Sequence, residues 1–316
     1  MIGTLATKGL LAGFKGMLRN RTLGGSLLCL LLTGVLAAGV YLPDASACSS
    51  FAVYGEQTYF GSNFDFDLGT EVRFTLQEAG GEKLFLASFR QGMQWLDVMG
   101  YNTAGLFATL QMVPPKETQV QGQPTMMVPQ LMAVSLFGAS SVDDVLDYLG
   151  NARLVPVPGF YLHSLYADTA GRALVVEAGE TANYVQEMDG RYLGMTNFYH
   201  QDWDEEDLTP KVDGGMDRYL IMRDALGELK EDGQVLDVEA VLAVLQSVAQ
   251  GAHTLASTVV DPVAQMLYLV IDADYSRVWQ VDLVEQTIAA WRGLDDQDVR
   301  PFPRRGVAAA DLRQWH

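Results

Sequence analysis

The sequence predicts an α+β protein in which antiparallel sheets pack on each other and are covered by helices. Runs of β-branched and aromatic residues, separated by short turn signals, predict strands joined in hairpins. Four stretches with apolar residues at helical spacing predict helices. These helices come in pairs between groups of strands, without the strict strand–helix alternation that a parallel doubly wound sheet needs. A layered α+β domain therefore fits the order of elements best.

The first expected elements form a hairpin. Ser49–Tyr54 and Thr58–Phe64 are the strands, and Gly55-Glu-Gln57 is typical of a turn between them. Three more strands are expected, with a turn at Gly80-Gly81, over Glu71–Gln77, Lys83–Phe89 and Gly105–Met112. Helices follow at Val128–Phe137 and Val142–Leu149, where Ser140 or Ser141 supplies the N-cap of the second helix.

The second half of the chain repeats this order. A meander of strands is expected over Tyr161–Ala167, Arg172–Glu177, Asn183–Glu187 and Arg191–Thr196, followed by the solvated acidic loop Asp202–Asp207. Helices are expected at Met216–Leu229 and Asp237–Gln250, and closing strands at Thr254–Val260, Gln265–Ile271 and Val278–Leu283. Residues 300–316 are rich in Pro, Arg and Ala, so we expect a loose C-terminal tail at the end of a single domain spanning residues 48–316.

Residues 1–47 have the pattern of a secretory signal peptide. Four basic residues, Lys8, Lys15, Arg19 and Arg21, precede an almost unbroken apolar run over residues 24–42. Small residues at Ala45 and Ala47 then form a cleavage site. Cleavage after Ala47 would make Cys48 the first residue of a secreted or periplasmic protein.

An N-terminal cysteine combines a nucleophile and a base in one residue. The thiolate is the reactive form, and an unperturbed thiol with a pKa of about 8.5 is mostly protonated at neutral pH. An α-amino group has a pKa of about 8, which suits a general base. This arrangement is the basis of N-terminal nucleophile hydrolysis. Two alternatives remain: Cys48 is an ordinary small residue after the cleavage site, or it is lipidated in a lipoprotein that acts as a binding or structural module.

Charge and cysteine content limit the partners. The formal net charge is −18, and removing residues 1–47, with four basic residues and one acidic residue, makes it −21. Such an anionic chain is not expected to bind nucleic acid or an anionic membrane surface. Cys29 leaves with the signal peptide, so Cys48 has no partner for a disulfide or a cysteine-based metal site. We expect no cofactor and no stable membrane anchor after processing, and we leave a homo-oligomer open.

Several segments, in order along the chain, resemble one family. Cys48-Ser-Ser-Phe followed by Gly61-Ser-Asn-Phe-Asp65 resembles the opening of the choloylglycine hydrolase and penicillin V acylase family. Further similarity lies at Asn102–Leu106, Ser141–Val145, Tyr166–Glu177, Thr196-Asn197, Asp217–Tyr219 and Thr254–Tyr268. Members of this family are cysteine N-terminal nucleophile hydrolases that cut linear amide bonds. The resemblance implies the four-layer αββα fold and amidase activity on N-acyl compounds with apolar acyl groups, such as penicillin V, N-acyl homoserine lactones or conjugated bile salts.

The resemblance also implies roles for individual residues. Cys48 would be the nucleophile, and Asp65 would hydrogen-bond the region of its amine and thiol. Asn197 would donate its amide to the oxyanion, together with a backbone N–H near Gln111. Arg218 would lie beside the thiol and favour the thiolate. One position departs from the family: many members have an arginine where this chain has Ser62, which leaves Arg218 as the only matched cation.

Overall fold

The computed structural model describes residues 48–203, 215–229 and 236–315, and within them two antiparallel sheets of eight strands each dominate. The first sheet has the order β12 (Tyr192–Met195), β1 (Ser49–Tyr54), β2 (Thr58–Asp65), β13 (Thr254–Asp261), β14 (Met266–Ile271), β15 (Val278–Asp282), β16 (Thr287–Arg292), β17 (Arg300–Pro301). The second has the order β11 (Asn183–Glu187), β10 (Ala173–Ala178), β9 (Leu162–Asp168), β6 (Leu106–Met112), β5 (Gln94–Asn102), β4 (Glu82–Gln91), β3 (Val72–Ala79), β18 (Val307–Ala308). The short strands β7 (Thr125–Met127) and β8 (Arg153–Val155) form a parallel pair.

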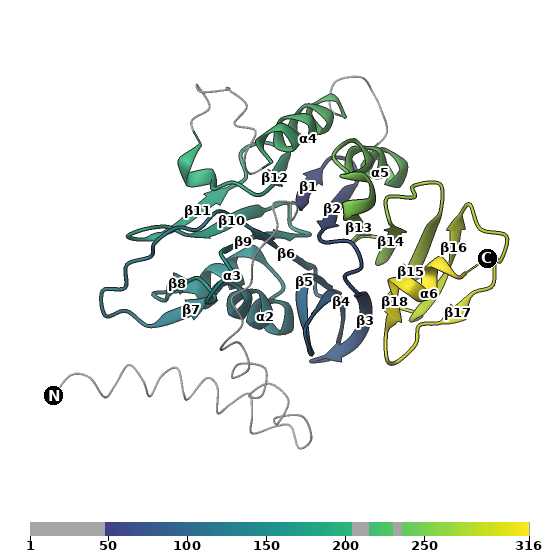
Figure 1. Cartoon of the computed structure of the whole chain (residues 1–316), viewed down its shortest axis with the longest axis horizontal. Coiled ribbons are helices and arrows are strands. Elements are labelled where there is room, and N and C mark those ends of the chain that lie inside the picture. Colours follow the sequence, from purple (N-terminus) through teal and green to yellow (C-terminus); the bar gives the residue numbers. More distant parts are fainter. Residues whose placement is uncertain (1–47, 204–214, 230–235, 316) are drawn as a thin grey trace, which may run out of the picture. The chain divides into compact units, whose positions relative to one another are not determined.

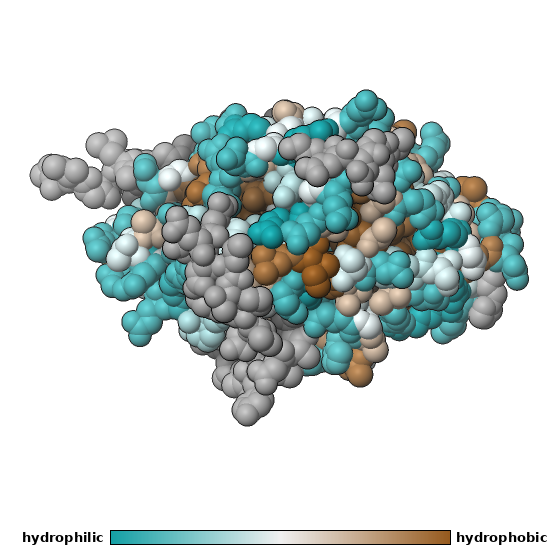
Figure 2. Space-filling model, turned by 90° about the horizontal axis from the view of Figure 1, so that it is seen from above, coloured by the Kyte–Doolittle hydropathy of each residue, from teal (hydrophilic) through white to brown (hydrophobic). Residues whose placement is uncertain are grey.

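The helices cover the outer faces of the two sheets (Figure 1). Helices α4 (Met216–Glu228) and α5 (Val238–Ser247) lie on the first sheet, and α2 (Val128–Gly138) and α3 (Val142–Leu149) lie on the second. One hydrophobic cluster fills the space between the sheets, and each helix pair has its own cluster against a sheet. The structure thus has the four layers αββα, which confirms the predicted fold class. The face that bears α4 and α5 is mostly hydrophilic, with some hydrophobic residues exposed near its middle (Figure 2).

Strand β1 shows how the sequence directs side chains to two different layers. Successive side chains of a strand point to opposite faces of the sheet. Phe51 and Val53 belong to the cluster under α4 and α5, whereas Ala52 belongs to the cluster between the sheets. Cys48, an even number of residues before Ala52, also joins the cluster between the sheets. The alternation of β1 therefore directs the thiol into the interior.

Each strand and helix expected from the sequence is present, within a few residues of its expected ends. Strands β5 and β16 and the short strands β7, β8, β17 and β18 were not expected. Strand β5 contains Asp97 and Gly100, which are unfavourable in strands. Asp97 accepts a hydrogen bond of 2.6 Å from Ser88 Oγ on β4. A Cβ atom on Gly100 would lie 2.5 Å from a methyl group of Leu136 on α2. Both residues are thus compensated by neighbours that are distant in sequence.

The expectation of a loose tail over residues 300–316 is wrong. Strand β18 pairs with β3, with Val307 opposite Phe74. Helix α6 (Ala309–Arg313) follows, and its Leu312 is fully buried at one end of the cluster between the sheets. The expectation rested on the high proline and arginine content of this segment. Its few apolar side chains nevertheless pack on the core and fix its position.

Two expectations concern residues outside the described part of the chain. The signal peptide covers residues 1–47, and most of the acidic loop Asp202–Asp207 also lies there. Among the helices that are described, none has the length and apolar character needed to cross a membrane.

Leu312→Ala should lower the free energy of unfolding by about 2–5 kcal/mol, because it leaves a cavity in a packed site. The control is Gln314→Ala, an exposed position nearby, which should change stability by less than about 0.5 kcal/mol. Urea unfolding of both variants measures the difference. Equal stabilities would mean that the C-terminal segment does not pack on the core in solution.

Candidate active site

The candidate nucleophile lies at the start of β1, between the two sheets. Cys48 is the free cysteine of the described residues, and 8% of its surface is exposed. Its thiol contacts the backbone carbonyl oxygen of Asp65 at 3.7 Å, at the end of β2. The antiparallel pairing of β1 with β2 places these two strand ends side by side.

Arg218 connects Cys48 to the candidate oxyanion residue. Its Nη1 donates 2.8 Å hydrogen bonds to the carbonyl oxygen of Cys48 and to Ser49 Oγ. Its Nη2 donates to Asn197 Oδ1 at 3.0 Å. The guanidinium comes from the first turn of α4 and is buried, so the sheet and the helix are joined by a charged group with several donors.

Gly215 leaves the space that the guanidinium occupies. Its φ of 78° lies in the left-handed region, and a Cβ atom at this position would be 2.0 Å from Arg218 Nη2. The carbonyl oxygen of Gly215 also accepts a 2.9 Å hydrogen bond from Thr196 Oγ1. Sequence reasoning did not identify this glycine. The only available signal was its place directly before the helix that carries Arg218.

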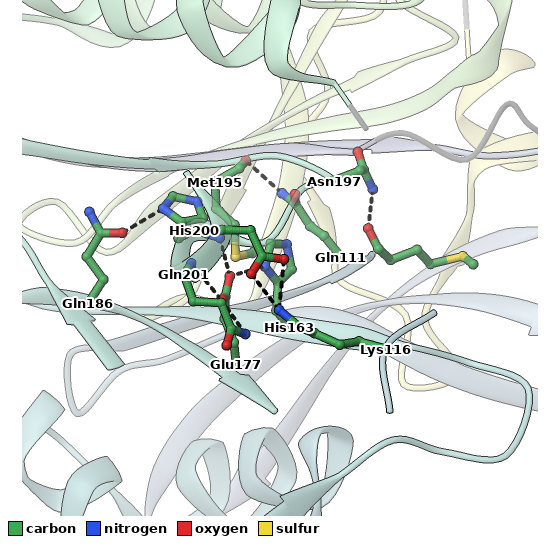
Figure 3. Close-up of polar contacts among 11 residues, drawn as sticks. Gln111, Lys116, His163, Glu177, Gln186, Met195, Asn197, His200 and Gln201 are labelled. Carbon is green, nitrogen blue, oxygen red and sulfur yellow. Dashed lines mark hydrogen bonds and ion pairs between the residues drawn. The ribbon is translucent and has the colours of Figure 1, made fainter. Parts of the chain in front are cut away.

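The orientation of the Asn197 amide follows from its partners. Arg218 can only donate, so it faces Oδ1, and the carbonyl oxygen of Met112 can only accept, so it faces Nδ2 at 2.7 Å. Figure 3 shows Asn197 pointing toward the end of β6. An amide nitrogen has two hydrogens. One is bound to Met112, and the other can be donated to an oxyanion.

Asp65 is near the thiol, but its carboxylate has other partners than expected. Its two oxygens accept hydrogen bonds from Thr254 Oγ1 and, at 3.1 Å, from Gln250 Nε2. The contact with the thiol is made by the backbone carbonyl of Asp65. Burial raises the pKa of the carboxyl to about 6, although the hydrogen bond from Thr254 and the charge of Arg218 oppose the rise. A buried acid with such a shift is typical of a functional site.

The thiol itself is held in its protonated form. Burial is the largest cause that raises the pKa of Cys48, the negative charge of Asp65 adds to it, and the pKa reaches about 12. Arg218 acts in the opposite direction but does not compensate. To act as a nucleophile, this thiol would therefore need a base in direct contact to become a thiolate at neutral pH.

Gln111 contributes its side chain to the arrangement of the site. Its Nε2 donates to Ser50 Oγ at 2.7 Å and to the carbonyl oxygen of Met195 at 3.1 Å. Ser50 Oγ lies 3.3 Å from Ser62 Oγ, so Ser62 takes part in a neutral hydrogen-bonded group. The predicted oxyanion role of a backbone N–H near Gln111 stays a prediction. The pairing of β5 with β6 ends at Thr109, and no other strand of the described residues pairs with the end of β6 on that side.

A narrow cavity adjoins the thiol between the sheets and has room for about one water molecule. Its wall contains no charged residue and consists of Cys48, Ser62, Asn63, Phe64, Val72, Ala87, Val98, Met99, Leu110, Ala256 and Thr258. Phe66 and Phe89 pack against Phe64 behind this wall. In the described residues, no group of three or more His, Cys, Asp or Glu side chains is arranged to hold a metal ion.

Solved structures share this architecture. The first two are conjugated bile acid hydrolase from Clostridium perfringens, as a cysteine-to-alanine mutant and an arginine-to-leucine variant. Each has a TM-score of 0.60 and 15% sequence identity, and the matches cover 78% and 79% of this chain and 96% and 98% of the other. Penicillin V acylase from Agrobacterium tumefaciens has a TM-score of 0.53 and 16% identity, covering 81% of this chain and 99% of the acylase.

The chain has the N-terminal nucleophile hydrolase fold. The resemblance found in the sequence motifs is thereby confirmed at the level of the fold. No protein-family model and no curated protein matches the sequence. Within the N-terminal nucleophile fold, the structure brings Cys48, Asp65, Asn197 and Arg218 together at one end of the first sheet, as the motifs predicted. Ser49, Gly215 and Thr254 complete their contacts and were not foreseen.

Two substitutions should shift the reactivity of the thiol in opposite directions. Arg218→Met removes the charge that lowers the pKa of Cys48, so alkylation by iodoacetamide at neutral pH should become slower. Asp65→Asn removes a charge that raises this pKa, so alkylation should become faster. Rate–pH profiles of both variants and the wild type provide the measurement. Shifts of the same sign in both variants would show that charge does not control the thiol.

The buried carboxyl of Asp65 should make stability depend on pH. Its pKa is raised from 3.8 to about 6 in the folded state, so the native protein binds more protons than the unfolded chain between these values. The free energy of unfolding should therefore fall, by about 3 kcal/mol, as the pH rises from about 4 to 6, and stay level above. Asp65→Asn should remove this component. The difference in unfolding free energy between variant and wild type, measured across this pH range, should grow by a similar amount.

Proposed function

We propose that this protein is an amidase that hydrolyses linear amide bonds of N-acyl compounds through a thioester on Cys48. The observation that carries the proposal is the Arg218 network. One guanidinium holds the carbonyl of Cys48 and the amide of Asn197, so a nucleophile and an oxyanion donor are fixed relative to each other. The fold shared with amide hydrolases supports the same reaction class.

In the proposed mechanism, the α-amine of Cys48 takes the proton of the thiol, and the sulfur attacks the carbonyl carbon of the amide. The carbonyl oxygen becomes an oxyanion that accepts the remaining N–H of Asn197. The carbon–nitrogen bond then breaks, and the ammonium group returns its proton to the leaving nitrogen. Water, deprotonated by the amine, attacks the thioester and releases the acid, and the sulfur recovers its proton.

The amine exists only if the chain is cut before Cys48. Cleavage of residues 1–47 during export to the periplasm or the medium is therefore part of the proposal. The high pKa of the buried thiol supports it, because a protonated thiol needs an adjacent base. No His, Glu or Lys side chain is within hydrogen-bond distance of the thiol among the contacts of the described residues.

The cavity beside Cys48 supports apolar, linear acyl groups as substrates. Its wall is uncharged, and it includes Ser62, at the position where many members of the family that the sequence resembles have arginine. It is also narrow, and we propose that a flexible chain or a single flat ring enters when side chains such as Met99 rotate, whereas a rigid fused-ring system would require the two sheets to separate. We propose fatty acyl or phenoxyacetyl amides, including N-acyl homoserine lactones, ahead of conjugated bile salts.

A series of acyl chain lengths on one amine tests the proposal. Each methylene that becomes buried contributes about 0.8 kcal/mol, so kcat/KM should rise up to about fourfold per added carbon until the cavity is filled. A taurine-conjugated bile salt serves as the comparison substrate. A flat profile, or the bile salt as the best substrate, would contradict the proposed acyl preference.

Two controls test separately the role of Cys48 as the nucleophile and the removal of residues 1–47. Cys48→Ala should abolish hydrolysis of every substrate and keep the thermal unfolding transition. Mass spectrometry of the active protein should give the mass of residues 48–316 without lipid. Active protein that retains residues before Cys48 would exclude the amine as the base.

A further inference from the structure

Glu177 is a buried carboxylate that the proposed reaction does not use. It lies on β10 between the two sheets, and its side chain is fully buried. A buried carboxylate is costly unless it is paired and hydrogen-bonded. Among the described residues, the side chain that stands opposite it is that of His163 on β9, which is also fully buried. No lysine or arginine of the described residues forms an ion pair with the Glu177 carboxylate. Its hydrogen bonds must therefore stabilise the buried charge.

Those contacts lead to the segment that carries Asn197. Glu177 Oε1 accepts the backbone N–H of His200 at 2.7 Å, and Oε2 accepts the backbone N–H and the side-chain amide of Gln201 at 3.2 and 3.1 Å. His163 Nδ1 lies 3.2 Å from Oε1. Figure 3 shows these groups gathered around the carboxylate. Backbone N–H groups can only donate, so the side chain at position 177 must present an acceptor atom at the place of each of its two oxygens.

The carboxylate stays ionised in this environment. Burial raises the pKa of Glu177, but the hydrogen bond from His163 and the hydrogen bond from the backbone N–H of His200 contribute to lowering it, and its pKa lies below the ordinary value. His200 is neutral, since burial lowers its pKa to about 3. Its Nδ1 is 2.7 Å from Gln186 Oε1 on β11, which fixes the ring. The cluster is therefore a fixed set of acceptors and donors, and none of its side chains contacts Cys48 among the hydrogen bonds of the described residues.

The segment from Thr196 to Gln201 is thus held at both ends. At its start, Thr196 bonds the carbonyl of Gly215, and Arg218 holds the Asn197 amide. At its end, Glu177 binds the two successive backbone N–H groups. Between them, the ring of Phe198 stacks on that of His200 with centroids 5.0 Å apart. The contact of Glu177 with the backbone N–H groups of His200 and Gln201 is the second anchor of this segment. Asn197 precedes His200 by only three residues, so a shift of the second anchor moves the Asn197 amide relative to Cys48.

We infer that Glu177 is a positioning residue, which holds the Thr196–Gln201 segment so that the Asn197 amide is in place for the oxyanion. The inference rests on the proposed amidase reaction. It adds to that reaction a residue that acts through Asn197 and does not contact the substrate itself. A displacement of about 1 Å in a group that stabilises the transition state can reduce the rate about 100-fold. The position of the second anchor therefore has a direct effect on kcat.

Glu177→Gln tests this assignment with almost no change in volume. One oxygen becomes an NH₂ group, which is a donor and cannot accept a hydrogen bond from the N–H group that it faces. We expect kcat to fall about 10- to 100-fold with KM changed less than about twofold, because Asn197 acts on the transition state. Alkylation of Cys48 should keep its wild-type rate. The matched control is Glu180→Gln, an exposed acid on the next turn, which should keep the wild-type kcat.

A double-mutant cycle separates positioning from a general structural effect. Asn197→Ala alone should lower kcat by about 10²–10³. If Glu177 acts through Asn197, the double variant should be no slower than Asn197→Ala. Losses that multiply would overturn the inference while leaving the amidase proposal intact. A normal kcat in Asn197→Ala would instead refute the proposed oxyanion role, and the inference would fail with it.

A milder variant covers the case in which Glu177→Gln does not fold. Gln201→Met removes one donor to Oε2 and keeps the backbone N–H. It should lower kcat about three- to tenfold, again with KM nearly constant and with no further loss when combined with Asn197→Ala. An unchanged kcat in a folded Gln201→Met protein would overturn the assignment.

Discussion

The buried guanidinium of Arg218 is the interaction on which the rest of the site depends. It binds the backbone of Cys48, the hydroxyl of Ser49 and the amide of Asn197, so the start of β1 and the segment of Asn197 are both held by one charged group from α4. Removing an arginine from water is costly, and the cost is offset only when its donors are satisfied. Asp65 contributes a negative charge nearby without a direct hydrogen bond to the guanidinium in the described contacts. The geometry around the candidate nucleophile is therefore maintained by a buried charge and its hydrogen bonds.

The two buried acids of the site have opposite environments, and this separates their roles. Asp65 has hydroxyl and amide donors, but burial prevails, so its pKa rises to about 6. Glu177 has backbone N–H groups and a histidine around it, so its pKa falls. A carboxyl that changes charge near neutral pH is suited to tune a neighbouring thiol. One that stays ionised is suited to hold a segment of backbone. The difference arises from the donors, since both groups are buried.

The two-sheet architecture explains why the buried thiol of Cys48 and a cavity without charged residues are found together. The alternation of β1 sends Cys48 into the cluster between the sheets, and the same cluster provides the wall around Phe64. The helix-facing residues of the first sheet contact α4 and α5 instead, and α4 brings Arg218 to the end of the sheet. The chemistry is thus located at the boundary where the interior, the sheet edge and a helix start come together.

The sequence by itself determined the periodic elements and the pairing of helices between groups of strands, and its resemblance to a known family pointed to four candidate site residues. The periodic elements are local, because alternation and helical spacing within a short stretch are enough to predict them. Only the tertiary structure decided the partners of those residues. Thr254 and Gln250 meet Asp65 from nearly 190 positions away, Gly215 matters because a guanidinium fills its space, and Glu177 reaches Asn197 through the backbone of another segment. The packing of the C-terminal segment was also decided by the tertiary structure, because its few apolar residues are buried against the cluster between the two sheets. Contacts between distant segments depend on how whole layers pack, and no local pattern contains that information.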